Sequence, residues 1–280
     1  MLPDAKFVHP DFSEEKTETY QLICSIAEHQ FTFLVTNRTQ DILMLQRFVN
    51  RDLLPVRELT EAVLEKESFL KKDFAYKQIL LHSSRWMLLP EMAYLKGADE
   101  DLLLMAHEVS ESEDDFIVDA IAPLSVRALY ATNKDLLEFF RKQFPQVQFR
   151  HVISQVIRQT HRIMNQANAE VLGLIEFIDF EMVYVIFRDG EPLFGNVFRV
   201  KNADEAFEYL KKVNIAYGLG PNDMKIGLVG IGPLVAGMQD KLSSFSENFI
   251  SSRDYYNRQE ELNNAGIYMD DYSHLQIPFG

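Results

Sequence analysis

One segment constrains the fold of this chain more than any other. It spans residues 170–200 and reads EVLGLIEFIDFEMVYVIFRDGEPLFGNVFRV. Its apolar residues form three runs, which are separated by short breaks that contain charged residues at 179–181 and 188–190. The second break holds an Asp-Gly pair, which favours a tight hairpin turn because glycine tolerates the positive φ angle that such turns need. The segment therefore predicts three consecutive antiparallel strands.

The residues after this segment predict a helix, a short buried strand and a second helix. Phe207, Leu210, Val213 and Tyr217 recur at helical spacing, and Asn202 is placed to cap that first helix. A strand at 226–229 then runs into a glycine turn at 230–233, and a helix is predicted at 234–242. A short apolar strand that lies between two turns is typical of the centre of a sheet.

The first half of the chain repeats this order in weaker form, after an arm at 1–18 that we expect to be irregular. Strands are predicted at 20–26, 31–36, 42–49, 78–82, 85–89, 116–121, 126–131 and 147–151. Helices are predicted at 56–69, from 91 to about 109, and at 134–143, and a helix at 151–169 links the two halves. We therefore expect an α/β protein with a first half at 1–165, including the linking helix, and a second half at 166–280.

Composition limits the classes of protein to which the chain can belong. Its formal charge of −14 would repel a phosphate backbone, which argues against broad nucleic-acid binding. Cys24 is the only cysteine, no run of about 18 apolar residues occurs, and the first twenty residues are acidic without an apolar core. We therefore expect a cytoplasmic protein that has no signal peptide and no membrane span.

Two charged segments offer binding sites for ions or partners. Residues 108–115, EVSESEDD, are the most acidic run and could bind a hard cation, but their spacing fits no calcium loop and favours a solvated loop. In the linking helix, Arg158, His161 and Arg162 could hold a phosphate or an acidic partner. Pairing of this positive face with nearby carboxylates is the alternative that we favour. The linking helix itself contains no Asp or Glu.

Two halves that each read as three strands, helix, strand, helix resemble the actin-like ATPase superfamily, which includes Hsp70-type ATPases, sugar kinases and bacterial actin-like proteins. More narrowly, the chain is similar to a bacterial domain-of-unknown-function family with an actin-like ATPase fold. It also resembles the actin-like proteins of type IV pilus and type II secretion assembly. The resemblance implies a duplicated, ribonuclease H-like fold, with two mixed-sheet halves around a cleft.

The resemblance also implies where a nucleotide would bind. Asp179 matches the aspartate of the family's Asp-x-Gly phosphate turn, but Glu181 stands where the glycine is expected. Gly230 and Gly232 match the glycine-rich turn that cradles adenosine. The first-half turn at 27–30 has neither aspartate nor glycine, and the linking helix offers only Gln155 and Gln159 in place of a catalytic carboxylate.

Each matched residue also has a structural interpretation. Aspartate is common in turns between strands, and glycines are common where a buried strand turns sharply into a helix.

Three hypotheses follow. The first is a degenerate, non-catalytic scaffold or interaction module that binds an unknown protein partner or forms a homodimer, without a cofactor. The second is a nucleotide-binding ATPase or kinase with diverged phosphate loops, which would use Mg-ATP at Asp179, Gly230 and Gly232. The third is an unrelated α+β protein whose strand order imitates the duplication. We predict no catalytic residue and no metal ligand.

Overall fold

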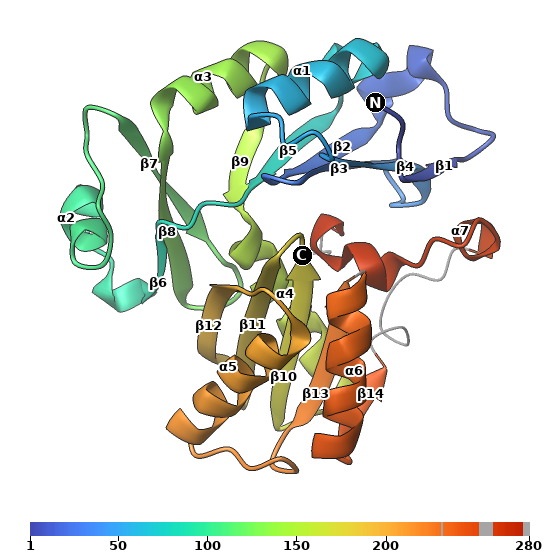
Figure 1. Ribbon diagram of the computed structural model, residues 1–280. Coiled ribbons are helices and arrows are strands. Elements are labelled where there is room, and N and C mark those ends of the chain that lie inside the picture. Colours follow the sequence, from blue (N-terminus) through green and yellow to red (C-terminus); the bar gives the residue numbers. More distant parts are fainter. Residues whose placement is uncertain (231, 252–259, 277–280) are drawn as a thin grey trace. The chain divides into compact units, whose positions relative to one another are not determined.

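The computed structural model describes residues 1–230, 232–251 and 260–276 (Figure 1). The chain forms two compact units, and both contain mixed sheets with helices, which confirms the predicted α/β class. Unit 1 comprises Met1–Ile121, Ser125–Val152 and Gln259–Ile267, and unit 2 comprises Ala122–Leu124, Ile153–Arg258 and Tyr268–Gly280.

Unit 1 is built on a six-stranded sheet. In spatial order its strands are β1 (Ala5–Val8), β4 (Ile42–Val49), β3 (Gln30–Thr36), β2 (Gln21–Ile26), β5 (Tyr76–Leu81) and β9 (Gln148–His151). β2, β3 and β4 are antiparallel neighbours, whereas β5 runs parallel to β2 and β9 parallel to β5. The expected irregular arm is wrong in part, because β1 pairs with β4 over four residues. That pairing satisfies backbone groups along the outer edge of β4.

Two helices cover one face of this sheet, α1 (Val56–Lys66) and α3 (Lys134–Gln143) (Figure 1). α3 begins after Asn133, a residue type that is favoured at helix N-caps, and its Oδ1 accepts a hydrogen bond from the backbone N–H of Leu136 at 3.2 Å. Leu137 and Phe140, which are three residues apart and therefore lie on one side of α3, are fully buried. The short helices η1 (Glu14–Thr19), η2 (Ser68–Lys71) and α7 (Glu260–Asn264) also belong to unit 1.

Between β5 and α3 the chain forms a separate small sheet, the inserted module (residues 85–121 and 125–133). Its strand order is β6 (Trp86–Pro90), β8 (Val126–Asn133) and β7 (Asp114–Ala120). The Arg85 guanidinium fixes the start of β7 by donating to both carboxylate oxygens of Asp114, at 2.6 and 2.7 Å.

The long helix that we expected between residue 91 and about 109 is wrong. The chain makes a short turn η3 (Glu91–Ala93) and then the two-turn helix α2 (Asp99–Leu104). Gly97 lies between them with φ of 89°, a left-handed conformation that interrupts a right-handed helix. Leu103 of α2 packs with Leu129 of β8 in the small core of the module.

Unit 2 contains a five-stranded sheet, which includes the three strands predicted from residues 170–200. Its order is β12 (Glu191–Arg199), β11 (Glu181–Arg188), β10 (Val171–Ile178), β13 (Lys225–Gly230) and β14 (Phe249–Ser251). β10, β11 and β12 are antiparallel, and β13 runs parallel to β10. Asp189 and Gly190 connect β11 to β12 with φ of 54° and 85°, which is the two-residue hairpin that the Asp-Gly pair predicts.

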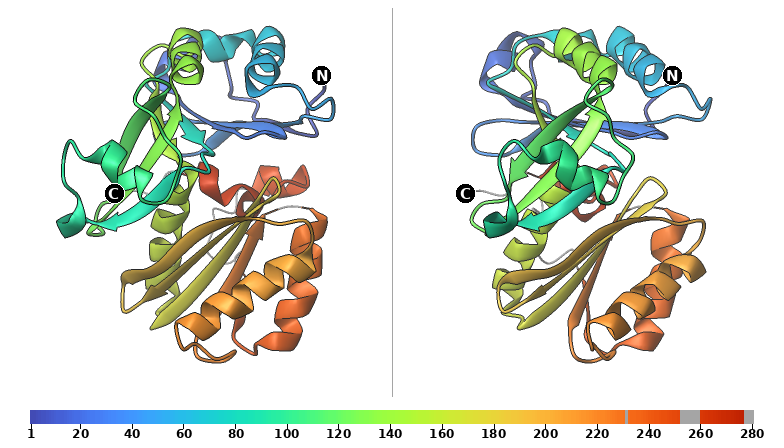
Figure 2. Two further views of the ribbon diagram at one scale, coloured as in Figure 1. Left: turned by 60° about the vertical axis from the view of Figure 1, so that its left-hand side comes forward. Right: turned by 90° about the vertical axis from the view of Figure 1, so that its left-hand side faces the viewer.

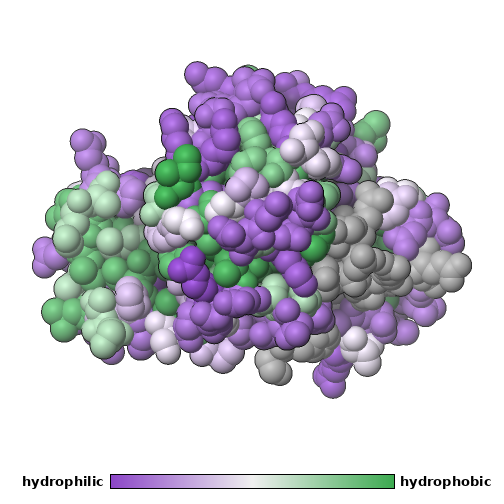
Figure 3. Space-filling model, turned by 90° about the horizontal axis from the view of Figure 1, so that it is seen from below, coloured by the Kyte–Doolittle hydropathy of each residue, from purple (hydrophilic) through white to green (hydrophobic). Residues whose placement is uncertain are grey.

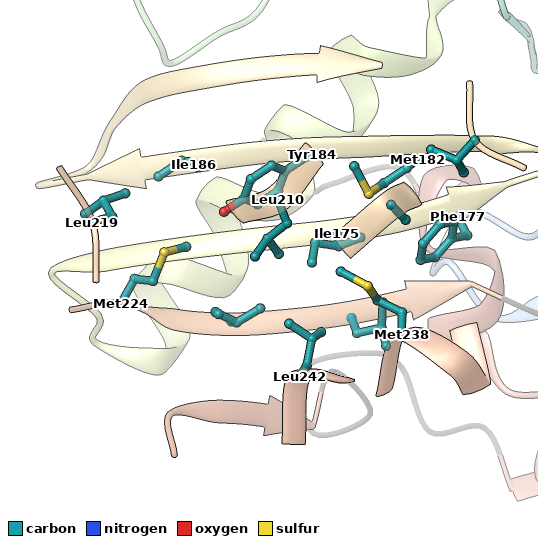
Figure 4. Close-up of a cluster of buried hydrophobic side chains, with 14 residues drawn as sticks. Ile175, Phe177, Met182, Tyr184, Ile186, Leu210, Leu219, Met224, Met238 and Leu242 are labelled. Carbon is teal, nitrogen blue, oxygen red and sulfur yellow. The ribbon is translucent and has the colours of Figure 1, made fainter. Parts of the chain in front are cut away.

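Helices cover both faces of the unit 2 sheet. On one face, α5 (Ala203–Ala216) and α6 (Pro233–Phe245) enclose a core that includes Ile175, Tyr184 and Leu210 (Figure 4). The linking helix α4 (Val152–Ala167) covers the opposite face (Figure 2). On that face the ring centroids of His161 in α4 and Phe187 in β11 lie 5.9 Å apart. Most of α4 therefore groups with unit 2, whereas the sequence-based division placed it with the first half.

The C-terminal part of the chain returns to unit 2 as the short helix η5 (Met269–Leu275), which packs on β13. The polar sequence at 253–264 also predicts a helix, of which the structure describes only α7, because residues 252–259 lie outside the described part of the chain. No helix among the described residues is both long enough and apolar enough to cross a membrane.

Candidate functional site

The structure brings the predicted phosphate and adenosine residues of the second half to one edge of the unit 2 sheet. β10 and β13 are parallel neighbours, and Phe177 of β10 pairs with Gly230 of β13. Asp179 and Gly232 each follow two residues later, so both turns leave the sheet at the carboxyl ends of these strands. In open α/β sheets this is the edge at which ligands bind.

Asp179 is the first of two residues in the tight turn between β10 and β11. Ile178 pairs with Glu181 across the turn, and Asp179 has φ of 60°. Aspartate tolerates this left-handed conformation better than most residues, so the turn alone accounts for an aspartate at this position. The carbonyl oxygen of Phe180 accepts a hydrogen bond from Val200 N–H at 3.0 Å, which ties the turn to the residue after β12. A phosphate-binding role for Asp179 stays a prediction.

The two glycines of the predicted adenosine turn differ in how much room a side chain would have at their positions. Gly230 has φ of 111°, and a Cβ at this position would lie only 2.4 Å from the carbonyl oxygen of Phe177. Gly230 is therefore required by the close approach of β13 to β10. Gly232, the N-cap of α6, has φ of 102°, but apart from its chain neighbours no described residue has an atom within 4 Å of where a Cβ would lie. Ile231 between them lies outside the described residues.

The two glutamines of α4 that could replace a catalytic carboxylate are engaged by the chain's own C-terminal segment. The Nε2 groups of Gln155 and Gln159 both donate to the backbone carbonyl of Gln276, each at 2.7 Å. Both glutamine side chains are buried. In addition, Oε1 of Gln159 accepts a hydrogen bond from Nε of Arg162 at 3.0 Å. The polar groups of α4 therefore hold the residue that follows η5.

A buried carboxylate next to this contact was missed by the sequence analysis. Glu176 of β10 is fully buried, and its Oε1 accepts hydrogen bonds from the backbone N–H of His274 at 3.0 Å and from Nδ1 of His274 at 2.8 Å. Within the described residues, Glu176 Oε2, His274 Nε2 and Ser273 Oγ have no hydrogen-bond partner. The available signal was a single acidic residue inside an otherwise apolar strand, but its partner lies 98 residues away in the sequence.

In the corresponding turn of unit 1, between β2 and β3, two backbone carbonyls accept hydrogen bonds from Asn50. Asn50 donates from its backbone N–H to the His29 carbonyl at 2.7 Å and from Nδ2 to the Glu28 carbonyl at 2.8 Å. Near this turn, Ser25 Oγ and His82 Nε2 lie 2.9 Å apart. Ser25 is fully buried, which removes its hydroxyl from contact with a substrate. Burial also raises the pKa of the Cys24 thiol far above its usual value, so the nucleophilic thiolate is suppressed.

No group of three or more His, Cys, Asp or Glu side chains suited to a metal ion occurs among residues 1–230, 232–251 and 260–276. The acidic run at 108–115 therefore does not form a cation-binding cluster in this structure. Two of its carboxylates form ion pairs instead, Asp114 with Arg85 and Asp115 with Arg141.

Comparisons with known proteins agree on the fold. The model of a family described as "Protein of unknown function (DUF3822)" matches residues 9–249. A solved structure from Bacteroides thetaiotaomicron, a protein with an actin-like ATPase fold and unknown function, superposes with a TM-score of 0.80 at 16% identity and covers 94% of this chain and 98% of its own. The PilM-PilN type IV pilus biogenesis complex contains a chain that superposes with a TM-score of 0.58 at 12% identity, covering 92% and 98%.

Among curated proteins, none matches this sequence. The structural similarities show that the protein has the actin-like ATPase fold, which confirms the resemblance inferred from the order of strands and helices. They also exclude the hypothesis of an unrelated α+β protein.

Proposed function

Because the chain belongs to the DUF3822 family and has the actin-like ATPase fold, we propose that it is a degenerate, non-catalytic actin-like protein that acts by binding another protein. The observation that carries this proposal lies on α4. The helix has no carboxylate to activate water, and its two polar candidates, Gln155 and Gln159, both donate to the Gln276 carbonyl. Both side-chain amides are therefore engaged by another part of the same chain.

The phosphate turns support the same proposal. Glu181 places a carboxylate where the family's glycine lets a phosphate approach the backbone, and a carboxylate repels a triphosphate unless a metal ion bridges them. In unit 1, the turn at 27–30 is braced by Asn50 and contains no aspartate. We therefore propose that the protein uses no cofactor.

Partner binding is supported by the solved structure of a protein with the same fold. The PilM chain in the type IV pilus biogenesis complex is bound to PilN. We propose that this chain likewise acts through protein contacts, with another protein as the first candidate and a second copy of itself as the other.

The alternative is a nucleotide-binding ATPase or kinase with diverged phosphate loops. One observation favours it, because Asp179, Gly230 and Gly232 meet at the carboxyl edge of β10 and β13. In that case Asp179 would hold metal-bound phosphates, and the two glycines would let adenosine contact the main chain.

Thermal unfolding with and without millimolar Mg-ATP separates the two functions. A ligand present at about 100 times its Kd stabilises the native state by roughly 2.7 kcal/mol. For a chain of this size that would raise the melting temperature by roughly 5–10 °C. We expect no rise, because the proposed protein binds no nucleotide.

A rise in the melting temperature with Mg-ATP would contradict the proposal. The variant Asp179→Asn would then test whether the nucleotide binds at Asp179. Asparagine tolerates the left-handed turn conformation, so this variant removes the charge while keeping the turn. If the rise disappears in Asp179→Asn, Asp179 holds the nucleotide's metal and the alternative function is correct.

A further inference from the structure

The inserted module exposes a group of large apolar side chains around α2. Twelve large hydrophobic residues are exposed among the described residues, and four of them lie between residues 92 and 105. They are Met92, Leu95, Leu104 and Met105, with exposed fractions of 95%, 68%, 50% and 80%. Figure 3 shows apolar atoms gathered on the lobe at the left, which is this module. We call these four residues the α2 patch.

The same stretch carries more than half of the formal charge of the protein. Residues 91–115 contain nine Asp and Glu residues and a single lysine, which gives −8 of the total −14. Three of the nine are neutralised by Arg127, Arg85 and Arg141. The other six form no ion pair within the described part of the chain, and they are Asp99, Glu100, Asp101, Glu108, Glu111 and Glu113.

The acidic residues border the α2 patch. α2 begins with Asp99, Glu100 and Asp101 and ends at Leu104. The acidic run at 108–113 folds back onto the helix, where the backbone N–H of Glu111 donates to Oε1 of Glu100 at 3.1 Å. Unpaired acidic residues thus adjoin the methionine and leucine side chains at both ends of α2. Methionine side chains adapt to partners of different shape because they are flexible and polarisable.

We propose that the α2 patch is the docking surface for a basic amphipathic segment of a partner protein. Leucine-like side chains of the segment would cover Met92, Leu95 and Met105, and its Lys or Arg residues would face Asp101, Glu108 and Glu111. This inference rests on the proposed partner-binding function and names the surface and the chemistry of the partner.

Charge decides against two other occupants. A second copy of the chain would bring its own six unpaired acids against those of the first if the two patches met, and like charges across an interface cost free energy. An anionic lipid surface would also repel the patch, because proteins bind such membranes through Lys and Arg residues.

Two synthetic peptides of about 18 residues, long enough to form a helix, test the proposal. One carries leucine on one face and lysine on the other, and its matched control carries glutamate in place of lysine. We expect the intact protein to bind the lysine peptide in fluorescence anisotropy, with an affinity that falls as NaCl is raised. It should not bind the glutamate peptide. Equal binding of both peptides, or of neither, would overturn the proposal.

Variants then locate the binding. Met92→Ser with Met105→Ser removes two exposed apolar side chains and should weaken binding of the lysine peptide at least tenfold, which is roughly 1.4 kcal/mol. Ile215→Ser, which removes one exposed apolar side chain from α5, is the control and should leave the affinity unchanged. If both variants bind as the unaltered protein does, the peptide is held elsewhere and the assignment is wrong.

Photo-crosslinking in cells separates failure of this inference from failure of the proposed function. A photoreactive amino acid is placed at position 105 in one variant and at position 215 in another. Crosslinks from position 105 to a Lys/Arg-rich amphipathic segment support the docking surface. Crosslinks from position 215 alone overturn the surface but leave partner binding intact, whereas stabilisation by Mg-ATP contradicts the proposed function whichever position crosslinks.

Discussion

Gly230 lies where two parallel strands approach too closely for any side chain. A Cβ there would lie 2.4 Å from the Phe177 carbonyl oxygen, and φ is 111°. We expect Gly230→Ala to lower the free energy of unfolding by roughly 3 kcal/mol or more, because steric overlap with backbone adds to conformational strain. Urea unfolding followed by circular dichroism measures the loss.

Gly232→Ala is the matched control for this prediction. Gly232 has a similar φ of 102°, but a Cβ there would meet no described residue beyond its chain neighbours, so only conformational strain of about 1–3 kcal/mol is expected. The two losses should therefore differ. Equal losses would show that conformation alone, and not contact with Phe177, requires glycine in this turn.

At the scale of elements, the contact between α4 and the end of η5 holds the C-terminal segment on unit 2. Gln155 and Gln159 share one acceptor, the Gln276 carbonyl. Either glutamine alone still satisfies that carbonyl, so we expect Gln155→Ala to cost about 1 kcal/mol or less. Gln159→Ala should cost more, because Nε of Arg162 also loses an acceptor. The double variant should cost more than the sum, by roughly 1 kcal/mol, because no donor remains.

A double-mutant cycle in urea checks this coupling, and amide hydrogen exchange in η5 provides a second measurement. The double variant should speed the exchange of the His274 amide, which donates to Glu176. Strictly additive losses with unchanged exchange at His274 would mean that the glutamines do not hold η5 in place.

The elements that the sequence predicted well are those set by local signals. The hairpin at Asp189 and Gly190 and the cap at Asn202, which accepts from Glu205 N–H at 2.9 Å, follow from residues a few positions apart. The three strands of the inserted module were predicted, but their pairing in a separate sheet was not, because β6 and β8 pair across about forty residues of chain. The partner of Glu176 was missed for the same reason: no local pattern connects it to His274.

At the scale of the whole molecule, 42 acidic residues outnumber 28 basic ones, and folding brings their charges closer together. Self-repulsion of this kind destabilises the compact state, and salt at about 0.15 M screens charges beyond roughly 8 Å. We expect the melting temperature to rise by a few degrees as NaCl is raised from low to roughly 0.3 M. Differential scanning fluorimetry measures the change.

The inserted module should account for a large part of this salt dependence, because it concentrates the uncompensated charge. Neutralising four of its exposed acids should reduce the salt-induced rise more than neutralising four exposed acids that are spread over other elements. The first variant combines D101N, E108Q, E111Q and E113Q, and the control combines E58Q, E65Q, E138Q and E247Q. A melting temperature that falls with salt would instead mean that ion pairs such as Arg85–Asp114 outweigh the repulsion, since screening weakens attraction and repulsion alike.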